Sequence, residues 1–266
     1  MLQLFDSHCH LDLPELLPAW QVHWSQAQSA GVAACLVPAV SAAHWQGLLQ
    51  LCQQQRNIFP ALGVHPWWAA KAQLDDCVQL EQLLKENPGV CAVGEIGLDF
   101  ALEPSTFALQ HTMFAAQLAI AERFAKPIIL HHRKSQPQLL AEIKRQKFSY
   151  GGILHAFSGS YAQAKAFIDL GFKLGIGGTI SYERAQKTIN TVRKLPLNSL
   201  VIETDAPAMP LSGYQGQINT PAHLVKVFNC LQAIRSESPV ELQQALWQNT
   251  LRALNLADSD PLIWQG

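Results

Sequence analysis

Short apolar stretches alternate with longer amphipathic segments along nearly the whole chain. The short stretches have the continuous hydrophobicity of buried strands, and the segments between them carry apolar residues at helical spacing. The pattern predicts strands at residues 2–10, 32–37, 58–63, 90–95, 127–131, 152–155, 172–176 and 199–204. It predicts helices at residues 14–30, 43–56, 75–86, 105–124, 135–146, 160–171 and 182–194, with two more starting at Thr220 and Ser238.

Residues at the ends of these segments support the assignment. Gly31 suits the C-terminal cap of the first helix, Pro221 suits a first helical position, and Ser238 with Glu241 forms a capping box. Eight strands alternating with helices favour one closed (β/α)8 barrel of the TIM type over an open sheet, because this α/β fold typically needs about 250 residues. With no linker or low-complexity tract in sight, we expect residues 1–266 to form a single domain.

Composition and charge narrow the range of partners. The chain has 19 Lys and Arg against 20 Asp and Glu, a net charge of −1, so it lacks the broad basic face that a long polyanion needs. No apolar stretch reaches the roughly 18 residues of a membrane span, and no secretory signal precedes the first strand. The six cysteines form no Cys-x-x-Cys pair, which is typical of a reducing compartment. We expect a cytoplasmic monomer without a membrane partner.

Histidines and carboxylates stand at the carboxyl ends of the predicted strands. These ends meet at one rim of such a barrel, where active sites lie. Each residue alone has an ordinary structural explanation, but their recurrence at one rim indicates a metal site. The residues are His8, His10, His65, Glu95, His131, His155 and Asp205.

This set divides into two groups of ligands. His8, His10 and Asp205 are expected to hold one divalent ion, His131 and His155 a second, and Glu95 to bridge the two. Such a pair of ions activates water for hydrolysis, with Glu95 and Asp205 as the catalytic carboxylates and Asp205 as the general base. The ligand types suit Zn²⁺, and Mn²⁺ and Mg²⁺ are alternatives.

Other residues near these strand ends receive supporting roles or none. Asp6 and Glu203 share the inward parity of His8 and Asp205, and we expect them to orient the ligands, the alternative being a buried pair without a catalytic role. The remaining histidines are expected to be ordinary surface or packing residues: His23, His44, His111, His132 and His223.

Several motifs along the chain resemble those of the TatD family of metal-dependent hydrolases. They are Asp6–Asp12, Gly63–Pro66, Gly94–Asp99, His131 with Arg133, His155–Gly159 and Glu203–Pro207. The resemblance implies a barrel, a two-metal centre and hydrolysis of phosphoester bonds, with deoxyribonuclease activity on DNA ends known in the family. Nucleases of the family commonly carry an Arg-Asn pair, an acidic residue and a proline after strand eight, where this chain has Gln217–Pro221. The chain thus looks more like a divergent branch of the family.

Candidate substrate contacts lie on the same rim. His65 and Arg133 are expected to meet a phosphate, and Trp67 to stack on a nucleobase; packing over the barrel mouth is the alternative for Trp67. Residues 206–219 form a long loop of the kind that binds substrates.

Two enzyme classes and one non-enzyme class fit these features. The first is a phosphoesterase acting on single-stranded DNA ends or nucleotides, and the second is an amidohydrolase or lactonase acting on a carbonyl. Amidohydrolases often bridge their metals with a modified lysine, whereas here strand four ends in Glu95, which disfavours the second class. A binding protein without turnover would have a damaged ligand set, and this set is intact.

Overall fold

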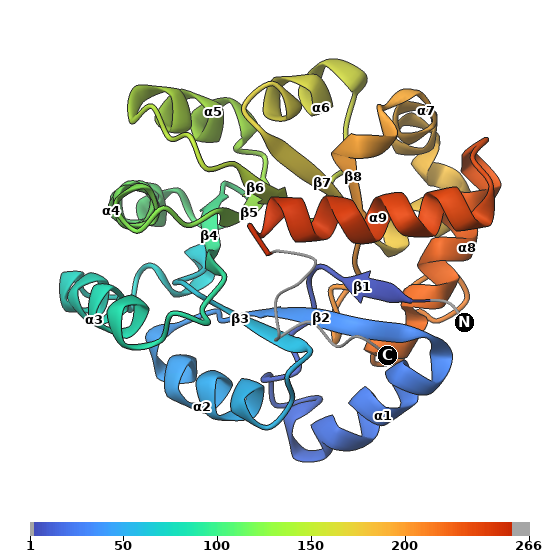
Figure 1. Cartoon of the computed structure of the whole chain (residues 1–266). Helices are drawn as coiled ribbons and strands as arrows, with labels where there is room; N and C mark the ends of the chain where they lie inside the picture. The colour runs from blue at the N-terminus through green and yellow to red at the C-terminus, as the bar shows by residue number, and fades with distance from the viewer. Residues whose placement is uncertain (1–2, 257–266) are drawn as a thin grey trace.

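Eight parallel strands, hydrogen-bonded in chain order, form a nearly closed barrel in the computed structural model, which describes residues 3–256 (Figure 1). The strands are β1 (Leu4–Asp6), β2 (Val32–Pro38), β3 (Ile58–Leu62), β4 (Ala92–Asp99), β5 (Ile128–Arg133), β6 (Gly152–Leu154), β7 (Phe172–Ile176) and β8 (Leu200–Ile202). This is the predicted TIM-type α/β barrel.

The seam between β8 and β1 is joined just beyond the strands. Ser7 N–H donates to the Ile202 carbonyl at 3.0 Å, and Asp205 N–H donates to the His8 carbonyl at 2.9 Å. These bonds tie the first and last strand ends together. The segments holding His8 and Asp205 are therefore fixed side by side.

Helices surround the strands, and α9 lies across one end of the barrel (Figure 1). The α-helices are α1 (Trp20–Ala30), α2 (Ala42–Gln53), α3 (Leu74–Glu86), α4 (Phe107–Arg123), α5 (Gln136–Arg145), α6 (Tyr161–Ile168), α7 (Gln186–Lys194), α8 (Leu224–Ile234) and α9 (Pro239–Ala253). Short 3-10 helices lie between these elements: η1 (Leu17–Ala19), η2 (Pro66–Trp68), η3 (Pro104–Thr106), η4 (Gly178–Ser181), η5 (Glu183–Ala185), η6 (Leu197–Ser199) and η7 (Pro221–His223). Within residues 3–256, no helix is both long and apolar enough to cross a membrane.

The apolar core has two parts. One lies inside the barrel, where Phe5, Leu36 and Ile129 pack in one cluster with Leu251 and Leu254 at the end of α9. The other lies between the strands and the outer helices. Because α9 closes the amino ends of the strands, the interior opens only toward the carboxyl ends, where the polar residues lie.

Two glycines allow β4 and β5 to approach closely beside Glu95. A Cβ on Gly94 would lie 2.5 Å from the Ile129 Cβ, and one on Gly97, whose φ is +147°, would lie 2.1 Å from the His131 carbonyl oxygen. The pairing register of the two strands shifts between Val93 and Ile96. Side chains other than hydrogen at these positions would push Glu95 away from β5.

Most predicted elements are present, with changed limits. Gly31 caps α1 with a φ of +106°, and Ser238 and Glu241 form the capping box of α9. The strand predicted at 90–95 runs instead from Ala92 to Asp99, because Ile96 and Leu98 continue the buried apolar pattern beyond the charged Glu95. The opening strand covers only Leu4–Asp6 of the predicted 2–10, and its first predicted residue lies outside the described part.

Candidate metal centre

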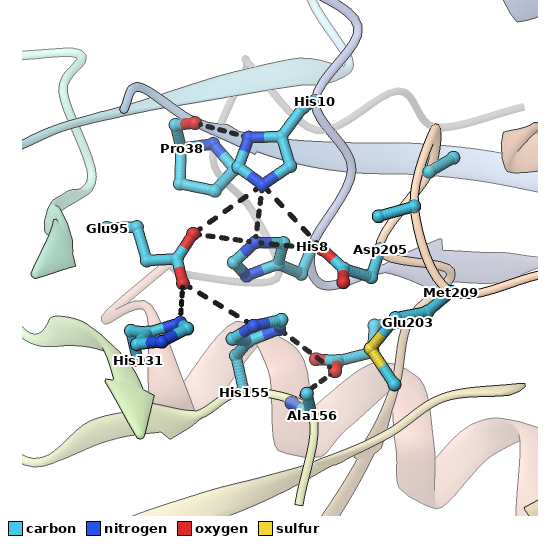
Figure 2. Close-up of polar contacts among 12 residues, drawn as sticks. His8, His10, Pro38, Glu95, His131, His155, Ala156, Glu203, Asp205 and Met209 are labelled. Atoms are coloured by element: carbon cyan, nitrogen blue, oxygen red, sulfur yellow. Dashed lines mark hydrogen bonds and ion pairs between the residues drawn. The ribbon is translucent and has the colours of Figure 1, made fainter. Parts of the chain in front are cut away.

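Four side chains form the first half of the site: two from just beyond β1, one from the middle of β4 and one from just beyond β8 (Figure 2). His8 Nε2 and His10 Nε2 lie 3.0 Å apart. Glu95 Oε2 is 3.2 Å from the former and 3.5 Å from the latter, and Asp205 Oδ1 is 3.6 Å and 3.7 Å from the same two nitrogens. All four predicted members of this group therefore meet at one point.

The second half of the site lies on the other oxygen of Glu95. Its Oε1 is 2.9 Å from His131 Nδ1, 3.4 Å from His155 Nε2 and 3.5 Å from His65 Nε2. The two oxygens of Glu95 thus face different sets of histidines, as a bridging carboxylate would. His65, which the sequence placed at the same rim but outside the two ligand groups, also lies here, since its Nε2 is 3.0 Å from His131 Nδ1.

The donor set fits divalent cations. The Nε2 atoms of His8 and His10, 3.0 Å apart, bring lone pairs against each other unless a proton or a cation lies between them. Only 2% of Glu95 and none of His8 is exposed, so water does little to relieve this crowding. A cation coordinated by nitrogen and carboxylate oxygen removes the conflict.

The far nitrogens of three histidines face acceptors outside the cluster. His10 Nδ1 lies 2.9 Å from the Pro38 carbonyl, His131 Nε2 lies 3.4 Å from Asp99 Oδ2, and His155 Nδ1 lies 3.2 Å from Glu203 Oε1. His10 Nδ1 is within hydrogen-bond distance of its acceptor, and a proton there leaves the lone pair of Nε2 facing the cluster. The same tautomer in His131 and His155 would place their protons toward Asp99 and Glu203. Metal-binding histidines are held in this way.

His65 has the opposite polarity. Its Nδ1 accepts a hydrogen bond from the Trp67 backbone N–H at 3.1 Å, as the cap of η2. The proton of the neutral ring therefore resides on Nε2, which faces the cluster as a donor rather than as a ligand.

Burial and neighbouring charges shift the pKa values of these groups in different directions. Burial lowers the pKa of His8 and His10, and it lowers that of His65 to about 3. Burial also raises the pKa of Asp205 to about 7. Burial alone would lower the pKa of His155, but the negative charges of Glu95, Asp205 and Glu203 outweigh it and raise that pKa to about 10.

The pKa of Glu95 falls well below its usual range in spite of burial, because His65, His155 and His8 face it. Burial likewise opposes charge on His131, but hydrogen bonds with Asp99 and Glu95 outweigh it and raise the pKa of that imidazole. The cluster thus keeps Glu95 ionised at neutral pH.

Asp205 adopts an uncommon backbone conformation. Its φ is +56°, in the left-handed region, where a residue with a side chain is strained. The bond from its N–H to the His8 carbonyl holds it there. Asn219 also holds this loop, since its Nδ2 donates to the Thr204 carbonyl at 2.8 Å and to the Ala208 carbonyl at 2.9 Å.

Asp6 and Glu203 differ in what they contact. Glu203 lies against His155, as expected, and also accepts a bond from the Ala156 N–H at 2.5 Å. Asp6 accepts from the backbone N–H of His8 at 3.3 Å and of Thr204 at 2.9 Å, and burial raises its pKa to about 8. It fixes the strand ends rather than an imidazole ring.

A pocket of about 510 Å³ opens over the cluster and is lined by the predicted substrate residues His65, Trp67 and Arg133. Trp67 is 55% exposed, yet its indole N–H donates to Asp99 Oδ2 at 2.7 Å, which fixes the ring. The Arg133 side chain is 59% exposed and its Nη1 lies 4.0 Å from the same oxygen.

The sequence analysis missed three residues of this region. Asp99 contacts His131 and Trp67, His132 lines the pocket, and Met209 forms part of its wall on the Asp205 side (Figure 2). Asp99 had a signal in the sequence, since it shares the parity of Glu95 on β4. Met209 had none, because its place depends on the path of a loop.

Comparisons with known proteins agree with this geometry. The family of TatD related DNases matches residues 5–255. The uncharacterized metal-dependent hydrolase YjjV of Escherichia coli K12 is 41% identical over 255 residues, which cover 96% of this chain and 98% of that protein. An uncharacterized metal-dependent hydrolase of Haemophilus influenzae is 40% identical over 261 residues, covering 93% and 98%.

Solved structures show the same fold. The crystal structure of the Escherichia coli TatD homologue YjjV superposes with a TM-score of 0.92 at 41% identity, over 96% of this chain and 98% of that one. A TatD family hydrolase of Entamoeba histolytica, at 19% identity, has a TM-score of 0.82 over 95% and 98%. The chain therefore belongs to the TatD family and is a metal-dependent hydrolase of that family.

Proposed function

We propose that this enzyme hydrolyses phosphoester bonds with two divalent cations, as a TatD-like deoxyribonuclease or phosphodiesterase. The observation that carries the proposal is the orientation of the histidines. His10, His131 and His155 each turn one nitrogen to an outside acceptor and the other toward Glu95. Nothing in ordinary core packing requires three rings to be turned the same way.

The residues present suit two ions. His8, His10, Asp205 and Glu95 would hold one, and His131, His155 and Glu95 the other. Bound there, divalent cations lower the pKa of a water molecule toward neutrality and offset the negative charge that develops at a phosphoester. Zn²⁺, Mn²⁺ and Mg²⁺ are the candidates for this mixture of imidazole and carboxylate.

Asp205 and Glu95 have different roles in this scheme. Both oxygens of Glu95 face imidazoles, so we assign it to holding the ions. The Asp205 carboxylate is 13% exposed and lines the pocket, so it can take a proton from a water molecule there. Glu203 and Asp99 keep the rings of His155 and His131 in place.

The other pocket residues would bind the substrate. The Nε2–H of His65 can donate to a phosphate oxygen, and Arg133 supplies a cation at the pocket edge. Trp67 offers a fixed aromatic face to a nucleobase. A single arginine on the pocket wall supports local contact with a strand end or nucleotide rather than with a long duplex.

The cellular setting follows from the same features. The six cysteines are all unpaired, which supports a reducing compartment, and we propose the cytoplasm. We also propose that the enzyme acts as a monomer, because the site draws its side chains from one chain.

The test is an assay of the metal-loaded protein against phosphodiesters, phosphomonoesters, carboxylic esters and lactones, with Glu95→Ala as the blank. Asp169→Ala is the matched control, because it removes an exposed carboxylate whose ion pair, within residues 3–256, is with Lys165 on α6. We expect phosphoester hydrolysis that is lost in Glu95→Ala and in Asp205→Ala and kept in Asp169→Ala, with circular dichroism unchanged in all.

Two results would contradict the proposal. Full phosphoesterase activity in Glu95→Ala or in Asp205→Ala would contradict the proposed mechanism. Turnover of lactones or amides with no phosphoester cleaved would favour the carbonyl chemistry of a metal-dependent amidohydrolase or lactonase.

A further inference from the structure

A second, smaller pocket adjoins the metal pocket. It measures about 240 Å³ and is lined by residues of the loops after β7 and β8, among them Thr179, Tyr182, Arg184 and Met209. Met209 also lines the metal pocket. The two pockets therefore share Met209, which lies on the Asp205 side of the cluster (Figure 2).

Hydrogen bonds between the two loops give this pocket a fixed shape. The Tyr182 hydroxyl donates to the Pro210 carbonyl at 2.7 Å, and the Ser212 N–H donates to Ser181 Oγ at 2.8 Å. The loops also pack closely, since a Cβ on Gly178 would lie 2.9 Å from the Met209 carbonyl oxygen. A pocket braced in this way needs little reorganisation on binding.

Arg184 is the one charged residue of the pocket lining. Its guanidinium carbon lies 4.5 Å from the centre of the Tyr182 ring, which orients the side chain. Within the described part of the chain, no carboxylate forms an ion pair with it. Its hydrogen-bond donors therefore remain available to an anion, beside the hydroxyl of Thr179.

We propose that this pocket is a subsite for the phosphate of the nucleotide next to the one that occupies the metal pocket. Guanidinium groups bind phosphate in a bidentate manner, and the apolar faces of Met209 and Pro210 suit the sugar that joins the two phosphates. The inference rests on the proposed function, and it names the substrate: a nucleotide chain with at least two phosphates. The nucleotide chain would pass over Met209 from one pocket to the other.

The test measures binding and turnover separately. Isothermal titration calorimetry compares thymidine 3′,5′-bisphosphate with thymidine 5′-monophosphate and thymidine 3′-monophosphate on the metal-loaded wild type, Arg184→Gln and Arg184→Lys. We expect the wild type to bind the bisphosphate more tightly than either monophosphate. In Arg184→Gln this ratio of affinities should be roughly tenfold smaller, and in Arg184→Lys it should lie between the two. The control is Arg193→Gln, which removes the same charge from the exposed end of α7, outside both pockets.

The same variants are then assayed on the dinucleotide TpT with and without an added terminal phosphate at either end. In the wild type we expect a lower KM for one of the two phosphorylated forms, and a loss of that difference in Arg184→Gln at unchanged kcat.

The outcomes separate the two proposals. If Arg184→Gln keeps the wild-type preference for the bisphosphate, or Arg193→Gln loses as much, the subsite is wrong. If the binding preference depends on Arg184 but no phosphoester is cleaved, the subsite stands and the proposed activity fails.

Discussion

Replacing Gly175 by alanine tests whether Glu203 controls the metal centre through His155. Gly175 lies on β7 directly behind Glu203, and a Cβ there would be 2.0 Å from Glu203 Oε2 and 2.6 Å from its Cδ. Non-bonded heavy atoms essentially never lie closer than 3.0 Å to a Cβ, so the carboxylate must move away by about 1 Å. It would then leave the position 3.2 Å from His155 Nδ1.

The expected losses follow from this displacement. Misplacing a catalytic group by about 1 Å, or losing the partner of a ligating histidine, costs on the order of 10–100-fold in activity or metal affinity. Overpacking adds about 1–3 kcal/mol of destabilisation. We measure metal affinity by competition with a chromophoric chelator, kcat/KM on bis(p-nitrophenyl) phosphate, and stability by urea unfolding.

Gly177→Ala is the matched control. A Cβ at Gly177 would lie 3.5 Å from Glu203 Cγ, an ordinary contact, and the φ of −107° accepts alanine. We expect its metal affinity and kcat/KM to stay within about twofold of the wild type.

A double-mutant cycle with Glu203→Ala identifies the route of the effect. Removing the Glu203 side chain makes room for the new methyl group, so Gly175→Ala should cost almost nothing in that background. The coupling should then be about 1.4–2.7 kcal/mol. If the penalty of Gly175→Ala persists in full without Glu203, or if Gly177→Ala is equally damaging, the positioning role of Glu203 is refuted.

Three further predictions concern metal, charge and nucleic acid. Chelation should lower the free energy of unfolding, by about 2.7 kcal/mol relative to protein with free metal at 100 times its Kd, and an unchanged urea midpoint would contradict a bound cation. The Arg235 guanidinium lies 2.5 Å from Glu237 and lowers the pKa of that carboxyl in the folded protein. The pair therefore stabilises the fold at pH values above the pKa of an unfolded glutamate, about 4.3, and this stabilisation is lost as the pH falls through the lower pKa of the folded state. The difference in unfolding free energy between wild type and Glu237→Gln should therefore shrink from pH 7 to pH 3, whereas a constant difference in urea titrations would count against the pair. Single-stranded oligonucleotides should bind weakly, and their anisotropy signal should fall steeply between about 50 and 200 mM salt; tight, sequence-specific duplex binding at physiological salt would oppose this.

The barrel could be predicted from the sequence because each strand and helix has a local signal. The apolar run at 32–37 matches β2 closely, since a strand buried on both faces leaves a continuous hydrophobic pattern. The limits predicted at 172–176 also match β7, although Lys173 interrupts its apolar residues. Their carboxyl ends must then share one rim, so the ligand residues could be found without any knowledge of their contacts.

The shape of the site could not be predicted in the same way. His8 and His10 were expected on one extended strand, but β1 ends at Asp6. Beyond it, Cys9 N–H donates to the Leu36 carbonyl at 3.0 Å and His10 N–H donates to the Ala206 carbonyl at 2.7 Å. These partners are far away in the sequence, and they bring the two imidazoles to 3.0 Å.

His65 shows how a local contact distinguishes two roles that the sequence cannot separate. Its Nε2 lies in the midst of the ligands, and distance alone would make it a fifth histidine ligand. The Trp67 N–H, however, occupies Nδ1 at 3.1 Å, so the neutral ring has no lone pair left on Nε2. A ligand needs that lone pair, whereas a phosphate oxygen needs the proton that Nε2 bears instead. The cap of a single 3-10 turn thus leaves His65 with a donor rather than a lone pair facing the cluster, and its contact with a substrate phosphate stays a prediction.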